Sequence, residues 1–266
     1  MTFHRRTLRG DARFEGLGLH SGAQVKVTVH PGTRGVAFRQ GAFRTAARPE
    51  NVTDTTRCTR LGEISTIEHL MSALAGLEIT DAEIEVEGGE MPGLDGSAAK
   101  FVRGLCAAGF EDLGEASIEP PFERVFFHEG EVRVAVAAGE GHWRYEYCLD
   151  GRWPGTQVYE AADAVEEYVE EIAPARTFCL LEEVERIRAA GLGLGLDETS
   201  ALVLGADGYA NSARFENEPA RHKLLDLMGD LYLAGVPVRA LAVAAERSGH
   251  TANVATAALL ARCVGG

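Results

Sequence analysis

The chain of 266 residues is 45% hydrophobic, which allows one large or two ordinary domains with a sizeable core. Its formal net charge of −14 argues against nucleic acid and anionic membranes as partners, and five scattered cysteines indicate reduced thiols rather than a disulfide framework. Because neither a membrane-spanning apolar run nor a secretory signal is visible, we expect a cytoplasmic protein without a transmembrane segment.

The first part of the chain alternates between strand and helix patterns. Val25, Val27 and Val29 alternate with polar residues after the turn signal His20-Ser21-Gly22, which predicts a β-hairpin over residues 8–30. We expect His20 to have a surface or structural role rather than a ligand role. Helical periodicity follows at 65–77, then a strand at 82–86 and a second helix from 95 to about 108.

The start of the first helix allows two interpretations of Glu68. Ser65 or Thr66 can cap the helix, and Glu68 lies three residues after Ser65, the spacing of a capping box. In this interpretation Glu68 only stabilises the helix end. In the other interpretation, developed below, Glu68 is a general base.

A domain boundary is predicted near the middle of the chain. The composition becomes acidic around residues 112–121, and this stretch ends in Glu119-Pro120-Pro121. Charged, proline-rich segments of this kind are typical of boundaries between domains. The sequence therefore predicts an N-terminal domain over residues 1–118 and a C-terminal domain over residues 119–266.

The second part of the chain repeats the alternation of strands and helices. Alternating apolar residues predict strands at 132–136 and 143–147, then an acidic helix at 160–172, an amphipathic helix at 180–190 and a strand at 201–204. Gly191, Gly193 and Gly195 resemble part of a phosphate loop. Without a following Lys-Ser/Thr or a βαβ setting that signal is weak, and loop flexibility is the better account.

One later segment concentrates polar groups on a helix that is otherwise apolar. His222, Asp226 and Asp230 fall at i, i+4 and i+8, so they share one helix face. Buried carboxylates and imidazoles are costly unless they are paired or bind a cation. The segment therefore indicates either a core histidine capped by one carboxylate or a site for a divalent metal of the zinc class.

An internal repeat connects this helix to the earlier one. His69 and His222 each stand seven residues before a glycine, Gly76 or Gly229, and each helix precedes an apolar strand, at 82–86 and 238–243. A glycine-containing turn and an alanine-rich helix follow each strand. The sequence predicts an α+β fold of two duplicated α/β sandwich domains, with helices facing each other and one active site between them.

If the two histidine helices meet, their polar residues form a catalytic metal site. His69, His222 and Asp226 supply three ligands and leave a fourth position for water, the pattern of a catalytic zinc. Glu68 would be the general base, and His250, after the last predicted strand, a general acid. The short zinc-protease motifs are absent from the sequence.

Five motifs together resemble the family of UDP-3-O-acyl-N-acetylglucosamine deacetylases, zinc amidases of lipid A biosynthesis. The resemblance extends from about Arg6 to the last predicted helix. The motifs are Ser65-Thr66-Ile67-Glu68-His69, Asp95-Gly96-Ser97-Ala98-Ala99, Ala175-Arg176-Thr177-Phe178, Arg221-His222-Lys223-x-x-Asp226-x-x-Gly229-Asp230 and Ser248-Gly249-His250.

The resemblance implies a metal-dependent hydrolysis of an N-acetyl group on a UDP-sugar lipid substrate, with release of acetate. It implies zinc as the metal, with ferrous iron as an alternative, and a monomer is expected. The implied roles are metal ligands for His69, His222 and Asp226, base for Glu68, acid for His250 with Asp230 as its partner, oxyanion donor for Thr177, sugar contact for Phe178 and substrate contact for Lys223.

Two segments differ from the family pattern and concern the ends of the substrate. Asp150-Gly151-Arg152-Trp153-Pro154 stands where the family places a uracil contact, which is then either lost or supplied by Trp153. The resemblance implies that the apolar residues over about 178–205 form an acyl-passage insert, although Gly193-Leu194-Gly195-Leu196-Asp197 stands there in place of the Lys-Gly-Gly-Ser of the family. The residues alone favour an ordinary amphipathic helix. The rival functions are a related zinc amidase for another N-acetylated sugar nucleotide and a non-catalytic metal-stabilised binding protein.

Overall fold

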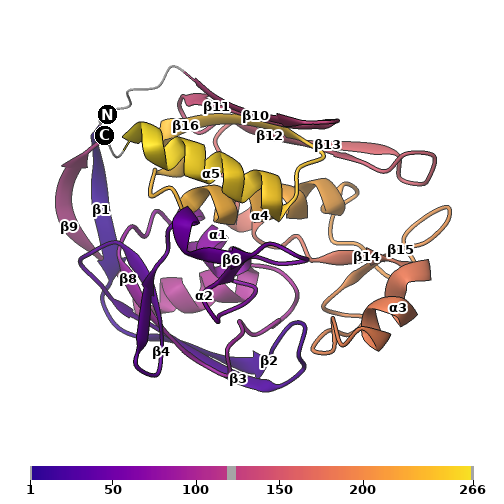
Figure 1. Cartoon of the computed structure of the whole chain (residues 1–266), viewed down its shortest axis with the longest axis horizontal. Helices are drawn as coiled ribbons and strands as arrows, with labels where there is room; N and C mark the ends of the chain where they lie inside the picture. The colour runs from indigo at the N-terminus through magenta and orange to yellow at the C-terminus, as the bar shows by residue number, and fades with distance from the viewer. Residues whose placement is uncertain (1, 119–123, 265–266) are drawn as a thin grey trace.

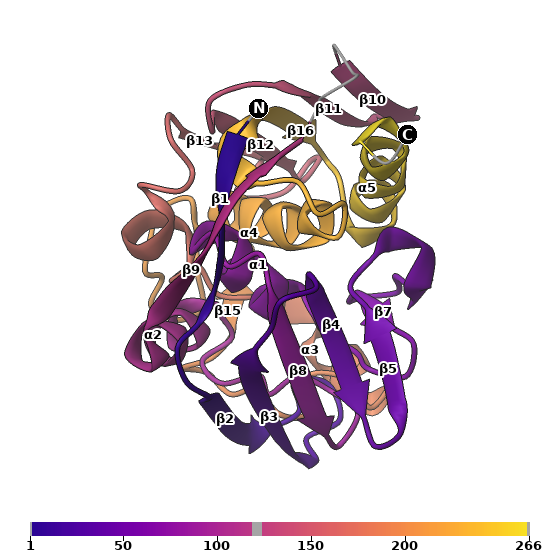
Figure 2. The same cartoon turned by 90° about the vertical axis from the view of Figure 1, so that its left-hand side faces the viewer.

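The computed structural model describes residues 2–118 and 124–264 of the chain. Two five-stranded sheets form the outer layers, and the main helices fill the space between them (Figures 1 and 2). The prediction of an α+β fold with two sandwiches and facing helices is confirmed. No helix within the described ranges is long and apolar enough to cross a membrane.

The first sheet comes from the N-terminal part of the chain and has the strand order β2-β3-β8-β4-β5. All neighbours are antiparallel except β4 and β8, which are parallel. Val25, Val27 and Val29 are buried on one face while their polar neighbours point outward, as strand alternation requires. The strands are β2 (Ala12–Leu17), β3 (Gln24–Pro31), β4 (Val36–Gln40), β5 (Phe43–Ala46) and β8 (Ala82–Glu87).

The second sheet repeats this plan with the order β10-β11-β16-β12-β13. Its only parallel pair among the described strands is β12 with β16, in the same place as β4 with β8. The duplicated unit predicted from the sequence is therefore visible in the topology. The strands are β10 (Arg124–Glu129), β11 (Val132–Ala138), β12 (Trp143–Cys148), β13 (Thr156–Ala161) and β16 (Leu241–Glu246).

The central helices carry the polar motifs. They are α1 (Glu68–Gly76), α2 (Ala99–Ala108), α4 (Glu218–Tyr232) and α5 (His250–Val264). Helices α1 and α4 pack against each other between the sheets, and α5 lies beside α4 (Figure 1). Every residue of α1 is buried, so its polar side chains must face partners inside the protein.

Smaller elements complete the fold. The pair β1–β9 runs alongside the helices in Figure 2, and the parallel pair β14–β15 lies beside α3 in Figure 1. The remaining strands are β1 (Thr2–Leu8), β6 (Val52–Asp54), β7 (Arg60–Leu61), β9 (Phe110–Ser117), β14 (Phe178–Leu180) and β15 (Leu202–Leu204). The remaining helical segments are η1 (Pro49–Asn51), η2 (Tyr168–Ile172), η3 (Leu181–Glu183), α3 (Val184–Ala189) and η4 (Val238–Ala240).

Two predicted elements are wrong in type or position. The acidic helix expected at 160–172 is the end of β13 followed by the short π-helical turn η2, because Tyr159 and Ala161 alternate into the core and Tyr168 and Ile172 anchor a single turn. The strand expected at 238–243 begins only at Leu241, after the turn η4. Acidic composition had masked the period of two in β13.

The predicted boundary stays a prediction. The segment 119–121 on which it depends lies outside the described residues. Strand β9, in the acidic stretch before it, pairs with β1 along its whole length. Residues 110–117 therefore belong structurally with the start of the chain.

Candidate active site

The site is formed where α1 and α4 touch. A Cβ atom on Gly229 would lie only 2.1 Å from the carbonyl oxygen of Glu68, so glycine permits the close approach of the two helices. The approach brings the rings of His69 and His222 to a centroid separation of 5.0 Å, nearly perpendicular to each other. The predicted meeting of the histidine helices is thus observed.

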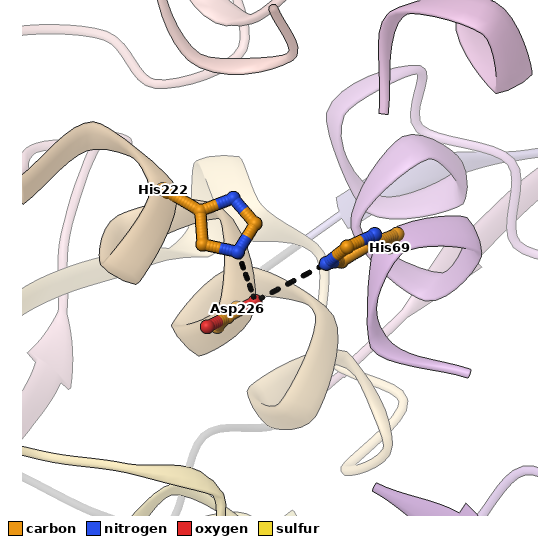
Figure 3. A group of neighbouring side chains, drawn as sticks. All are labelled: His69, His222 and Asp226. Atoms are coloured by element: carbon orange, nitrogen blue, oxygen red, sulfur yellow. Dashed lines mark ion pairs between the residues drawn. The ribbon is translucent and has the colours of Figure 1, made fainter. Parts of the chain in front are cut away.

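His69, His222 and Asp226 point toward one another in Figure 3, the first from α1 and the other two from α4. The Nε2 atoms of His69 and His222 lie 3.7 and 3.5 Å from Oδ1 of Asp226. That oxygen is buried and has no hydrogen-bond partner among the described residues. The three side chains offer ligand atoms within 4.8 Å of one another and could hold a metal ion.

The surroundings set the protonation states that metal ligands need. Burial, with His222 nearby, lowers the pKa of His69 to about 3, and burial also lowers the pKa of His222. Nδ1 of His222 donates to the carbonyl of Ala175 at 3.0 Å, which leaves Nε2 free to act as a ligand. Although burial disfavours its ionised form, Lys223 and His222 hold the pKa of Asp226 below its usual range.

Glu68 is not a helix cap. The residue before α1 is Ile67, no side chain caps the helix, and Thr66 has a positive φ of 62°, which excludes capping-box geometry. Oε2 of Glu68 instead accepts the backbone N–H of Thr59 at 3.0 Å. Burial raises the pKa of Glu68 to about 8, a value suited to proton transfer near neutral pH.

His250 and Asp230 form a second polar pair beside the first group. Nδ1 of His250 donates to Oδ2 of Asp230 at 3.0 Å. Burial disfavours the imidazolium, but the charge and hydrogen bond of Asp230 outweigh it and raise the pKa of His250 to about 9. His250 is therefore a cationic donor at neutral pH.

Two further residues hold this pair and were missed in the sequence. Thr59, fully buried, donates from Oγ1 to Oδ1 of Asp230 at 2.6 Å and contacts Nδ1 of His250 at 3.3 Å. Asn253 donates to Oδ2 of Asp230 at 3.0 Å. Asn253 stands one helical turn after His250, and this spacing could have identified it from the sequence as a residue on the same helix face. Thr59 has no local pattern that marks it.

The remaining predicted residues, Thr177, Phe178 and Lys223, also border the site. The backbone N–H of Thr177 donates to Gly96 at 2.7 Å, and its carbonyl accepts the N–H of Leu202 at 2.9 Å. The Phe178 ring lies 6.0 Å from the ring of His222. Nζ of Lys223 donates to Oδ2 of Asp226 at 2.9 Å and lies 5.7 Å from the Phe178 ring centroid.

A cavity of about 570 Å³ joins these groups. Of the predicted site residues only Asp230 does not line it; that residue is hydrogen-bonded to His250, which does. His20 also lines the cavity. The sequence had indicated only a surface or structural role for it. Trp153 does not line the cavity and packs against Tyr209, with ring centroids 4.6 Å apart.

Much of the apolar lining of the cavity comes from the segment between β14 and β15. Helix α3 in that segment has no buried residue, so its apolar side chains are not packed into a core. They face the cavity, together with neighbouring leucines. The larger apolar lining residues of this segment are Leu181, Val184, Ile187, Leu192 and Leu196.

Comparisons with known proteins agree on one family. The family model for UDP-3-O-acyl N-acetylglycosamine deacetylase matches residues 5–262. The chain is 38% identical to a UDP-3-O-acyl-N-acetylglucosamine deacetylase of Aquifex aeolicus, over 94% of this chain and 90% of that protein. It is 33% identical to the Leptospira biflexa deacetylase of the same name, over 98% of this chain and 89% of that protein. A bifunctional LpxC/FabZ enzyme of Chlorobaculum tepidum is 36% identical over 96% of this chain, which spans 63% of that enzyme.

Proposed function

This chain belongs to the family of UDP-3-O-acyl N-acetylglycosamine deacetylases, and we propose that its reaction depends on a divalent metal ion held between α1 and α4. The reaction is the hydrolysis of the N-acetyl group of UDP-3-O-acyl-N-acetylglucosamine in lipid A biosynthesis, with release of acetate. The observation that carries the proposal is the buried Oδ1 of Asp226, which lacks a hydrogen-bond partner among the described residues and faces two imidazole nitrogens.

The donor set fits a metal ion. An isolated buried carboxylate oxygen is costly, and a cation between Asp226, His69 and His222 removes that cost. Two imidazoles and one carboxylate suit zinc, with ferrous iron as the alternative, and three protein ligands are typical of catalytic sites. When bound, such an ion lowers the pKa of a bound water to about 7 and polarises the substrate carbonyl.

Glu68 and His250 divide the proton transfers between them. Glu68 accepts a proton from the attacking water, because its carboxylate lines the cavity beside the metal group and its pKa is raised to about 8 by burial. His250 gives a proton to the leaving nitrogen, since Asp230 keeps its imidazole charged at neutral pH. The amine then leaves as a neutral group.

Three residues bind and orient the substrate in this proposal. Thr177, fixed by backbone bonds on both sides, stabilises the developing oxyanion, a contribution of about 3 kcal/mol for such a donor. Phe178 packs against the sugar. The ammonium of Lys223, at the cavity wall, attracts the anionic substrate against the negative charge of the whole protein.

The apolar arm of the cavity is the passage for the 3-O-acyl chain in this proposal. Helix α3 turns apolar side chains to the cavity instead of to a core, which argues against an ordinary packed amphipathic helix. Each methylene buried there contributes at most about 0.8 kcal/mol. The segment 178–205 then acts as the acyl-passage insert of the second domain.

One assay tests the proposal directly. Acetate release is measured from UDP-3-O-acyl-GlcNAc and from unacylated UDP-GlcNAc, before and after chelation and after return of zinc or ferrous iron. We expect turnover of the acylated substrate, loss on chelation and recovery with a metal. Equal turnover of both substrates would instead favour an amidase for another N-acetylated sugar nucleotide. A cytoplasmic location and a monomeric state remain predictions from the sequence.

A further inference from the structure

One wall of the cavity is made where the two halves of the chain touch. The turn formed by residues 18–22, between β2 and β3, meets residues 193–196, which follow α3. The N–H groups of Leu194 and Gly195 donate to the carbonyls of His20 and Leu19 at 3.1 and 3.2 Å. Both segments line the cavity, through Leu19 and His20 on one side and Gly193 and Leu196 on the other.

The contact is too close for side chains. A Cβ atom on Gly195 would lie 2.2 Å from the carbonyl oxygen of Gly18, and one on Gly22 would lie 2.9 Å from Cβ of Leu194. Gly22 also has a positive φ of 63°. Glycine at these positions therefore lets two backbones meet, which accounts for Gly195 better than loop flexibility does.

The buried side chain of Glu90 accepts hydrogen bonds from the 18–22 turn. Glu90 is 3% exposed. Its two oxygens accept the N–H groups of His20 and Ser21 at 2.6 and 3.0 Å. They also accept the hydroxyls of Ser21 and Thr66 at 2.5 and 3.3 Å. Four donors that converge on one buried carboxyl group fix the conformation of the turn, since its oxygens would otherwise be buried without partners.

We propose that Glu90 and Gly195 form a latch that sets the recognition of the acyl chain. Glu90 fixes the 18–22 turn, the turn receives residues 193–196, and this docking holds Leu192 and Leu196 at the wall of the passage. The inference rests on the proposed acyl passage. Glu90 touches no substrate in it and is a positioning residue, so its effect is on KM for acylated substrate more than on kcat.

The test uses one variant on each side of this contact, at Gly195 and at Glu90. Gly195→Ala places a methyl group against Gly18 without touching the metal group, and Gly208→Ala is its matched control because nothing lies within 4 Å of the added Cβ. Glu90→Gln replaces one accepting oxygen with an amide N–H₂ group, which cannot accept the hydrogen bonds that this oxygen now receives from the turn. Steady-state kinetics are measured with UDP-GlcNAc carrying no, short or long 3-O-acyl chains. Metal content and melting temperature are measured for every variant.

We expect Gly195→Ala and Glu90→Gln to lower kcat/KM for the long-chain substrate about ten-fold, mainly through KM, with much smaller changes for the unacylated substrate. Gly208→Ala should match the wild type. Equal losses on all chain lengths, or no loss in Gly195→Ala, would overturn the latch. If Glu90→Gln does not fold, Gly195→Ala alone decides. A wild type without dependence on chain length would instead refute the passage itself, whatever the variants do.

Discussion

Nδ1 of His250 lies 3.0 Å from Oδ2 of Asp230, and the Asp230 side chain is fully buried. The other partners of Asp230, Thr59 and Asn253, both donate to it, so both carboxylate oxygens are held in place before any substrate binds. Asp230 itself does not line the cavity. In the proposed reaction, Asp230 would therefore act only by raising the pKa of His250.

The pH dependence of kcat/KM should show this pair. Because the pKa of His250 is raised to about 9, the proton donor is present below that pH and is lost above it, which gives the high-pH limb. Asp230→Asn should move the limb toward the ordinary histidine pKa of about 6.5. Asn253→Ala keeps the Asp230 charge and should leave the limb near its original position. A high-pH limb that persists at full rate in His250→Ala would exclude His250 as the acid.

The same interaction predicts a pH dependence of stability. A group whose pKa is raised on folding stabilises the protein fully below its unfolded-state pKa, about 6.5 for histidine. The contribution is lost as the pH rises through the folded-state pKa of about 9. Denaturant melts between those two pH values should show a smaller pH-dependent loss of unfolding free energy in His250→Ala than in the wild type. Identical slopes would show that the pKa of His250 is not raised on folding.

Glu68→Gln separates catalysis from folding. The amide oxygen of glutamine can still accept the N–H of Thr59, and no cap is lost because Glu68 caps nothing. We expect a melting temperature close to the wild-type value and a fall in kcat of about 10²-fold or more, since a neutral amide cannot take a proton. Both are measured on one preparation with its metal content. A wild-type kcat would remove Glu68 from the mechanism.

Metal analysis of purified variants tests the ligand set. We expect about one divalent ion per chain in the wild type and in Glu68→Gln, and loss of the ion in His69→Ala and Asp226→Ala. Chelation should abolish turnover, and zinc or ferrous iron should restore it. Full metal occupancy in both ligand variants would place the ion elsewhere.

The sequence predicted those parts of the site that repeat or follow a helical period. His222, Asp226 and Asp230 share a face of α4 as their spacing required, and the shared ground plan paired His69 with them. Thr59 could not be predicted, because a loop residue reaches Asp230 only through tertiary packing. Glu68 was open to two interpretations because the capping-box spacing is present in the sequence, and the cap is excluded by the backbone around Thr66 and Ile67, which the sequence does not reveal.

Those parts of the fold that follow a regular pattern in the sequence were also predictable. Period-two alternation identified β3, β8, β11 and β12, and the repeat implied that two such sheets enclose the helices. The helix predicted over 160–172 is wrong because the acidic composition of this segment does not distinguish a helix from the end of a strand followed by a single helical turn. The contact of residues 18–22 with 193–196 depends on backbone atoms alone, so side-chain patterns carried no signal for it.

The proposed acyl passage predicts that KM depends on the length of the 3-O-acyl chain. Methylenes that leave water for the surface formed by Val184, Ile187 and Leu196 should each contribute up to about 0.8 kcal/mol, and equally in ground and transition states. Lengthening the 3-O-acyl chain should therefore lower KM stepwise with little change in kcat, until the chain outgrows the cavity. Val184→Phe should shorten the length at which the gain stops, because it adds bulk to the wall without reaching the metal ligands. Steady-state kinetics over a series of chain lengths measure both effects. A flat series in the wild type would contradict the passage and favour an amidase for a shorter N-acetylated sugar nucleotide, since a chain that stays in solvent gains nothing from its length.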